Sequence, residues 1–238
     1  MLQPRLLLSC FTTLSVAAVA LLAFGPSAQA SVKDPTTASV LKAAKAAMLK
    51  ESGVHIVVDS RSGKTTSAII VDIGTSSGVE TITSGKESVT IEVTPKWAYL
   101  SGSASGLTTV MGLTSAEQKK VGSSSVSMKA GTTPYKNLKE NLTVSILPTL
   151  LPVAKGTSFS VGGGSNSKDY QLTWSTAATS SEPKTKSVLT ISSGSKTLPL
   201  DEVISSSTGG GTTVFSKWGE NVSVKKPASL VTYTKVFG

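Results

Sequence analysis

Apolar and polar residues alternate along most of the chain, in short runs separated by turn residues. In the first clear run, Val54, Ile56 and Val58 fall on one face, with His55 and Asp59 on the other. A period of two is typical of a strand with one buried face. The same pattern, with Ser, Thr, Gly and Val as the dominant residues, predicts strands over 54–59, 68–73, 79–83, 89–93, 97–100, 125–129, 157–161, 170–174, 188–192, 198–203, 212–215, 222–224 and 230–236.

The segment before the first strand has helical spacing instead. Its apolar stripe comprises Val40, Leu41, Ala44, Ala47 and Met48. Asp34 is the expected N-cap, with Pro35 at the first helical position and Gly53 after the end. One apolar stripe on an otherwise polar helix needs a sheet or a cavity to cover it.

The middle of the chain holds two further helical segments. Thr114-Ser115-Ala116-Glu117 is a capping box that starts a helix. Residues 135–151 have Leu and Ile at helical spacing, and Pro148 and Pro152 are expected to kink or end that helix.

The order helix, meander, apolar helical insert, meander predicts an α+β fold. We expect a large curved antiparallel sheet, a half-barrel, with the helices packed in its concave face. Such a trough can hold an apolar ligand. The candidate lining residues are Leu107, Val110, Met111, Leu147, Leu150 and Leu151. The alternative is that these six side chains simply fill the core.

The first thirty residues have the features of a secretory signal. Met1–Arg5 carries one positive charge, residues 6–24 are apolar and uncharged, and Gly25-Pro26 breaks the run. Ala28-Gln29-Ala30 supplies the small residues of a cleavage site. We therefore expect residues 1–30 to be a cleaved signal peptide, with an uncleaved membrane anchor as the alternative.

Export changes what the rest of the chain can be. Cys10, within the signal, is the sole cysteine, so disulfides and thiol chemistry are excluded from residues 31–238. These residues are expected to form one monomeric domain, secreted or associated with the cell envelope. Cys10 comes too early in the apolar run for a lipoprotein site, so no lipid tether is evident.

The composition restricts the partners. The chain has 23 Lys and Arg against 14 Asp and Glu, a net charge of +9. This charge favours solubility, with transient contact with an anionic membrane surface or wall polymer as the alternative. Aromatic residues are 5% of the chain and no dense basic block occurs, so we do not expect nucleic acid as a partner.

One motif suggests a hydrolase. Gly74-Thr75-Ser76-Ser77-Gly78 matches the G-x-S-x-G nucleophile elbow. That motif requires a strand before it and a helix after it, whereas residues 79–83 look like a strand. The only histidine, His55, precedes the serine instead of following it. A hairpin loop explains the motif better, and His55 is expected on a half-exposed strand, or facing the trough as a polar handle.

Other catalytic patterns are equally weak. Ser39–Lys42 and Ser193–Lys196 match S-x-x-K without the accompanying K-T-G and S-D-N motifs. Asp201 and Glu202 are adjacent and would point to opposite sides of a strand. No His, Cys and carboxylate cluster suggests a metal. We expect no catalytic residue, no metal and no cofactor.

Several stretches resemble one family of envelope proteins. They are Trp97-Ala98-Tyr99-Leu100 followed by Gly106-Leu107, Tyr135 with Leu138, the segment 198–203, and above all 213–227, where Trp218-Gly219 leads to a short strand and Pro227. They resemble the actinobacterial LppX/LprA/LprF/LprG family, whose half-barrel is that of LolA and LolB. The resemblance implies binding, and transport, of lipids or acylated glycolipids. Family members usually carry a lipidated Cys where this chain has Ala30-Ser31, which implies a soluble or wall-associated protein.

Three functional hypotheses follow. The first is a non-enzymatic lipid-binding half-barrel. The second is a wall-associated structural or interaction protein with a closed core and no ligand. The third, least supported by the residues, is a hydrolase.

Overall fold

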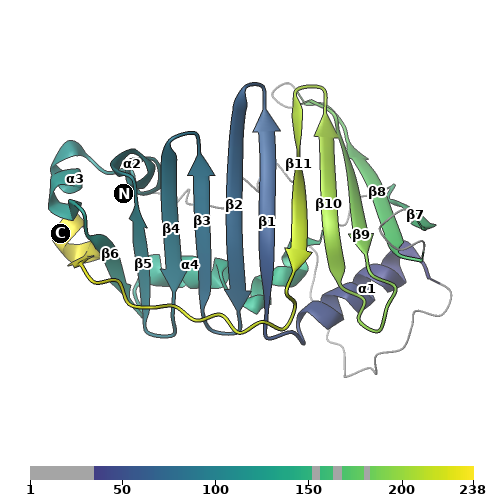
Figure 1. The fold of residues 1–238 in the computed structure, drawn as a ribbon, viewed down its shortest axis with the longest axis horizontal. Coiled ribbons are helices and arrows are strands. Elements are labelled where there is room, and N and C mark those ends of the chain that lie inside the picture. The colour runs from purple at the N-terminus through teal and green to yellow at the C-terminus, as the bar shows by residue number, and fades with distance from the viewer. Residues whose placement is uncertain (1–34, 152–155, 163–167, 180–182) are drawn as a thin grey trace.

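The computed structural model describes residues 35–151, 156–162, 168–179 and 183–238. They form one open, mostly antiparallel sheet with helices on one face (Figure 1). The strand order is β12-β6-β5-β4-β3-β2-β1-β11-β10-β9-β8-β7. The predicted α+β half-barrel architecture is confirmed.

The strands follow the predicted runs closely. They are β1 (Gly53–Ser62), β2 (Thr65–Gly74), β3 (Gly78–Ser84), β4 (Glu87–Val93), β5 (Trp97–Gly102), β6 (Ser125–Lys129), β7 (Ser158–Val161), β8 (Tyr170–Thr176), β9 (Thr185–Ile191), β10 (Pro199–Ser206), β11 (Gly209–Ser216) and β12 (Leu230–Thr232). Two meanders, β1 to β6 and β7 to β11, join where β1 pairs with β11. This contact between distant parts of the chain makes one sheet of them.

The face of the sheet that the helices cover is called the inner face below, and the opposite one the outer face. The register fixes which side chains share a face: Ile56 lies opposite Val71 on β2 and opposite Phe215 on β11. All three are buried, so they mark the inner face. Since side chains alternate along a strand, Val57 and its partners Ile70 and Val214 belong to the outer face.

The helices are α1 (Thr37–Met48), α2 (Ala104–Met111), α3 (Ser115–Val121), α4 (Thr133–Asn141), the 3₁₀ helix η2 (Val144–Leu150) and α5 (Tyr233–Phe237). Figure 1 shows α1 and α4 across the lower ends of the strands, and α2 near the upper ends of β4 and β5. The apolar stripe predicted for α1 is buried as a whole.

The start of α1 differs from the prediction. The N-cap is Thr36, whose hydroxyl accepts a hydrogen bond from the backbone N–H of Ser39, while the Ser39 hydroxyl accepts one from the backbone N–H of Thr36. Asp34 lies outside the described residues, and Pro35 precedes the cap instead of opening the helix. A reciprocal pair of hydroxyls satisfies the two free N–H groups directly, so it sets the boundary. The C-cap is Leu49, short of the predicted Gly53.

The other two helical predictions are confirmed with one change. The capping box of Thr114 and Glu117 starts α3. The predicted helix 135–151 is broken into α4 and η2, with Pro148 inside η2 and Thr143 between the two helices. A 3₁₀ helix tolerates this proline because the tighter turn is short and its hydrogen bonds are few.

The C-terminal segment departs most from the prediction. After β11 the chain crosses the lower strand ends on the outer face and reaches β6 at the edge (Figure 1). Residues 222–224 are not a strand, because this segment crosses the sheet, with Val222 beside Gly74 at the end of β2. The predicted last strand, 230–236, is a strand only over β12, which runs parallel to β6, and then becomes α5, capped by Thr232.

Candidate functional site

The inner face is mostly apolar over the lower part of the sheet, where the helices cover it, and is less covered further up. At mid-height Ile56, Val71 and Ile91 are fully buried. Closer to the upper strand ends, Val58 and Ile82 are only half-buried, although they have the same inner-face parity and pack against the same core. The helices therefore leave a strip of apolar side chains on the sheet partly uncovered.

The helices opposite that sheet also present half-covered apolar side chains. They are Val110 on α2 and Ile146 and Leu150 on η2. Helix α2 packs on β4 and β5, and η2 packs against α1 and α4. Half-buried apolar groups on both the sheet and the helices are where an added hydrocarbon would gain burial.

The six residues predicted to line a trough fall into two groups. Leu107, Val110 and Met111 share α2, whereas Leu147 and Leu150 lie on η2, with Leu151 as its C-cap. All six belong to or pack against one continuous apolar cluster. Four of them are buried, and Val110 and Leu150 remain partly exposed. Of the six, only these two keep side-chain surface that is not covered by the core.

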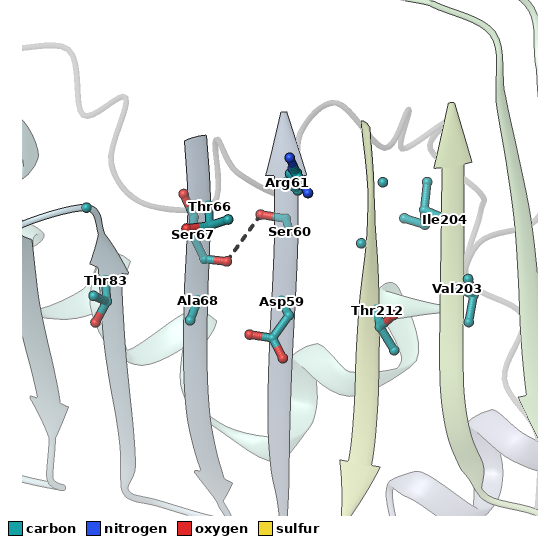
Figure 2. Close-up of a pocket in the computed structure, with 13 residues that line it drawn as sticks. Asp59, Ser60, Arg61, Thr66, Ser67, Ala68, Thr83, Val203, Ile204 and Thr212 are labelled. Carbon is teal, nitrogen blue, oxygen red and sulfur yellow. Dashed lines mark hydrogen bonds between the residues drawn. The ribbon is translucent and has the colours of Figure 1, made fainter. Parts of the chain in front are cut away.

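A separate hollow of about 560 Å³ lies at the upper ends of β1, β2, β10 and β11 (Figure 2). Its lining includes Asp59 and the register partners of Asp59 on the two flanking strands, Ala68 and Thr212, which belong to the outer face. Arg61 and Val203 share this parity. None of the six predicted residues lines it, although Ile204 on β10, whose side chain has inner-face parity, does.

The hollow has a simple origin in the sequence. Gly209, Gly210 and Gly211 open β11, so this part of the sheet has no side chains. A Cβ on Gly210 would lie 2.5 Å from the carbonyl oxygen of Ile204, and one on Gly211 would lie 2.8 Å from that of Asp59. These glycines thus allow β11 to approach both neighbours closely, and they leave a gap between the flanking side chains.

Two buried carboxyl groups interrupt the apolar inner face. Glu80 on β3 lies opposite Val71 and Ile91, and its residue is 5% exposed. Glu202 on β10 is 6% exposed. Burial raises the pKa of Glu80 to about 7. Burial likewise raises the pKa of Glu202 to about 7, although a hydrogen bond with the Ser187 side chain acts to lower it. Neutral carboxylic acids are therefore the relevant species over much of the pH range.

Sequence reasoning did not select these carboxyl groups. It placed Asp201 and Glu202 on opposite sides of a strand, which is confirmed: Asp201 is partly exposed and accepts a hydrogen bond from Thr190 at 3.1 Å, while Glu202 points inward. The sequence feature that could have identified them is the alternation of side chains along each strand. Glu80 lies two residues before Ile82 on β3, so both side chains point to the inner face. The pairing of β3 with β2 places Glu80 opposite the buried Val71.

His55 is a half-exposed strand residue, as predicted, and it lies on the outer face. Its Nδ1 is 2.6 Å from Oδ1 of Asp72, the register partner on β2. The alternative role of a polar handle in the trough is therefore wrong, because the odd-numbered residues of β1 point away from the helices.

The motifs with catalytic patterns have ordinary structural positions. Gly74–Gly78 spans the β2–β3 hairpin connection, followed by a strand instead of the helix that a nucleophile elbow requires. Ser39–Lys42 lies on α1, and Ser193–Lys196 lies in the β9–β10 connection. Within the described part of the chain, no group of three or more His, Cys, Asp or Glu side chains could hold a metal ion. Over the same residues, no helix has the length and hydropathy to cross a membrane.

Solved structures similar to this chain include those of two mycobacterial proteins. No family model matches the chain, and no curated protein matches it in sequence. The crystal structure of LprF from Mycobacterium bovis is 13% identical, with a TM-score of 0.46 over 80% of this chain and 96% of LprF. That of the Mycobacterium tuberculosis lipoprotein LppX is 16% identical, with a TM-score of 0.42 over 80% of this chain and 100% of LppX. LprF and LppX are two of the proteins whose family the sequence resembles.

Proposed function

We propose that the chain is a non-enzymatic protein that binds an apolar or amphipathic ligand, such as a lipid, between the inner face of the sheet and the helices. After export by the N-terminal signal, it would do so in a bacterial cell envelope. Transport of lipids or acylated glycolipids is the further step that the resemblance implies.

The observation that carries the proposal is the pair of half-covered apolar walls. Val58 and Ile82 on the sheet, and Val110, Ile146 and Leu150 on the helices, are all partly exposed at the border of one core. Each methylene buried there contributes about 0.8 kcal/mol, so one acyl chain supplies enough free energy for binding without any catalytic group.

A second candidate function has its own observation, on the outer face. Ile70, Val203 and Val214 are 42%, 44% and 43% exposed and lie on neighbouring strands beside the outer hollow. Apolar side chains gathered on an uncovered sheet face are typical of a surface that contacts another protein or a wall polymer. This is the interaction protein of the second hypothesis.

Two adjacent residues of β10 separate the two functions. Ile204 is half-buried on the inner face, and Val203 is exposed on the outer face. We expect Ile204→Trp to fill the upper end of the trough and reduce lipid binding at least tenfold. Val203→Trp adds similar bulk at the same strand end and should leave lipid binding unchanged. The measurement is native mass spectrometry of the protein purified from its own host, with fluorescent fatty-acid titration of both variants.

The amount of lipid bound by each variant distinguishes the two functions. Stoichiometric lipid that Ile204→Trp removes and Val203→Trp retains supports the trough. Protein from its own host that is free of lipid, and that takes up no offered lipid, would reject the proposal and leave the outer face as the functional surface. Circular dichroism and the Tm show that both variants fold.

A further inference from the structure

Glu202, on the inner face of β10, has a carboxyl oxygen with no hydrogen-bond partner. Its Oε1 is fully buried and has no partner, the one such side-chain atom over the residues that the structure describes. The carboxyl group interacts with the side chain of Ser187 on β9, which is itself buried. Buried polar atoms in proteins almost always have a partner, so an unpartnered oxygen at this place needs an explanation.

No neighbouring side chain donates a hydrogen bond to this oxygen. The register partners of Glu202 are Leu189 on β9 and Thr213 on β11, both buried, and Val58 follows beyond Thr213. Ion pairs in the described part of the chain join other residues, such as Lys196 to Glu51. Burial without a cation raises the pKa of Glu202 to about 7, so the group accepts and donates hydrogen bonds as a neutral acid at lower pH.

The position of Glu202 relative to the trough is favourable for a ligand. Two residues further along β10, about 7 Å away, Ile204 is half-buried on the same face. The partners of Ile204 in the sheet are Ser187 and Gly211, and Gly211 adds no side chain that would cover the strand. Glu202 therefore lies directly beside the half-buried part of the inner face on β10.

We propose that Glu202, held by Ser187, is the recognition point for a hydroxyl group in the head of an amphipathic ligand that occupies the trough. The hydroxyl donates its hydrogen to Oε1 of Glu202, and the hydrocarbon chain of the ligand contacts the half-covered apolar walls. This inference rests on the proposed function and adds to it a chemical class, an alcohol-bearing amphiphile. Above pH 7, where Glu202 is a carboxylate that can only accept, a ligand that lacks a donor leaves Oε1 unpartnered and binds more weakly.

The test compares two probes that differ in one hydrogen-bond donor. 1-Dodecanol and its methyl ether are offered to the full chain, and affinity is measured by displacement of anilinonaphthalene sulfonate. At pH 8, where Glu202 is a carboxylate, we expect the wild-type protein to bind the alcohol about tenfold more tightly than the ether. Glu202→Leu, which replaces the carboxyl group with an apolar group of similar volume, should bind both probes equally.

A matched control uses the other buried carboxyl group of the inner face. Glu80 is four strands from Glu202 in the sheet, so Glu80→Gln should keep the preference for the alcohol. Glu202→Gln retains an oxygen acceptor and should also keep it. If Glu202→Leu does not fold, the unbranched Glu202→Met takes its place.

The outcomes separate this inference from the proposed function. If the wild-type protein binds both probes with equal affinity, or if Glu202→Leu retains the preference, the role of Glu202 is rejected while binding in the trough stands. If the wild-type protein binds neither probe, both the proposed function and the role of Glu202 are overturned.

Discussion

At the scale of single residues, the buried carboxyl groups make the stability of the fold depend on pH. Glu80 lies on an inner-face row between Val71 and Ile91 and is buried among apolar side chains. Desolvation alone raises the pKa of Glu80 to about 7, from an ordinary value of 4.5. The folded protein therefore binds a proton that the unfolded chain releases between these two pH values, so folding is favoured at acid pH and loses stability as the pH rises.

This sign gives a measurable prediction for Glu80→Gln. Below pH 4.5 both states of the wild-type protein are protonated, and the variant has little effect. Above pH 7 the wild-type protein has lost about 3 kcal/mol of the free energy of unfolding, which the uncharged Gln does not lose. We expect the variant to be more stable than the wild type at pH 8 and equal to it at pH 4, in urea unfolding experiments. Glu202 titrates in both proteins and cancels in the difference.

Glu117 provides a control of opposite sign for Glu80→Gln. The backbone N–H and the hydroxyl of Thr114 both donate to its carboxylate, and these bonds lower the pKa of Glu117. The stabilisation that Glu117 contributes is present at neutral pH and disappears as the pH falls. Glu117→Gln should therefore lower the free energy of unfolding at neutral pH and have little effect in acid. A stability gain of Glu80→Gln that does not change between pH 4 and pH 8 would contradict the assigned cause.

At the scale of elements, the first residues of β11 leave no room for side chains. It lies between β1 and β10, and its first three residues are Gly209, Gly210 and Gly211. A Cβ on Gly209 would clash with the carbonyl oxygen of Arg61 on β1, and one on Gly210 would press on β10. The glycines have ordinary negative or extended backbone angles, so space and not conformation restricts them.

We expect Gly210→Ala to lower the free energy of unfolding by roughly 1–3 kcal/mol, because the strands must move apart to admit the methyl group. Gly194→Ala is the control: it lies in an exposed connection, and its Cβ would meet only the hydroxyl of Ser192, at 3.2 Å. Its effect should be within about 0.5 kcal/mol. Urea unfolding measures both. Equal, small effects of the two substitutions would show that β11 is not confined as described.

At the scale of the whole molecule, the sequence predicted the order of elements but not how distant strands pair. Period-two runs and turn residues located the two meanders, and the capping box of Thr114 and Glu117 located α3, because these signals are local. The pairing of β1 with β11 and the path of the C-terminal segment depend on contacts between distant residues. For the same reason Glu80 and Glu202 could not be selected: their burial depends on which face the neighbouring strands turn inward.

The pairing of the C-terminal segment with β6 leads to a prediction about assembly. β12 pairs with β6 and occupies the edge of the first meander, and α5 then buries Val236 beside it. An uncovered edge strand offers free N–H and C=O groups to a second chain. We therefore expect the full chain to be a monomer, and a chain truncated after Ser229 to associate through β6. Size-exclusion chromatography with light scattering measures the mass of each.

The control for this truncation keeps the backbone of β12 and removes only apolar contacts. In Val231→Ala with Val236→Ala, the hydrogen bonds to β6 remain while two buried side chains lose volume. Its Tm should fall, because each truncated Val leaves a small cavity, but it should stay monomeric. Association of the double variant to the same extent as the truncated chain would indicate that lost core packing, and not the open edge, drives assembly. Monomers in all three cases would mean that β12 does not protect β6.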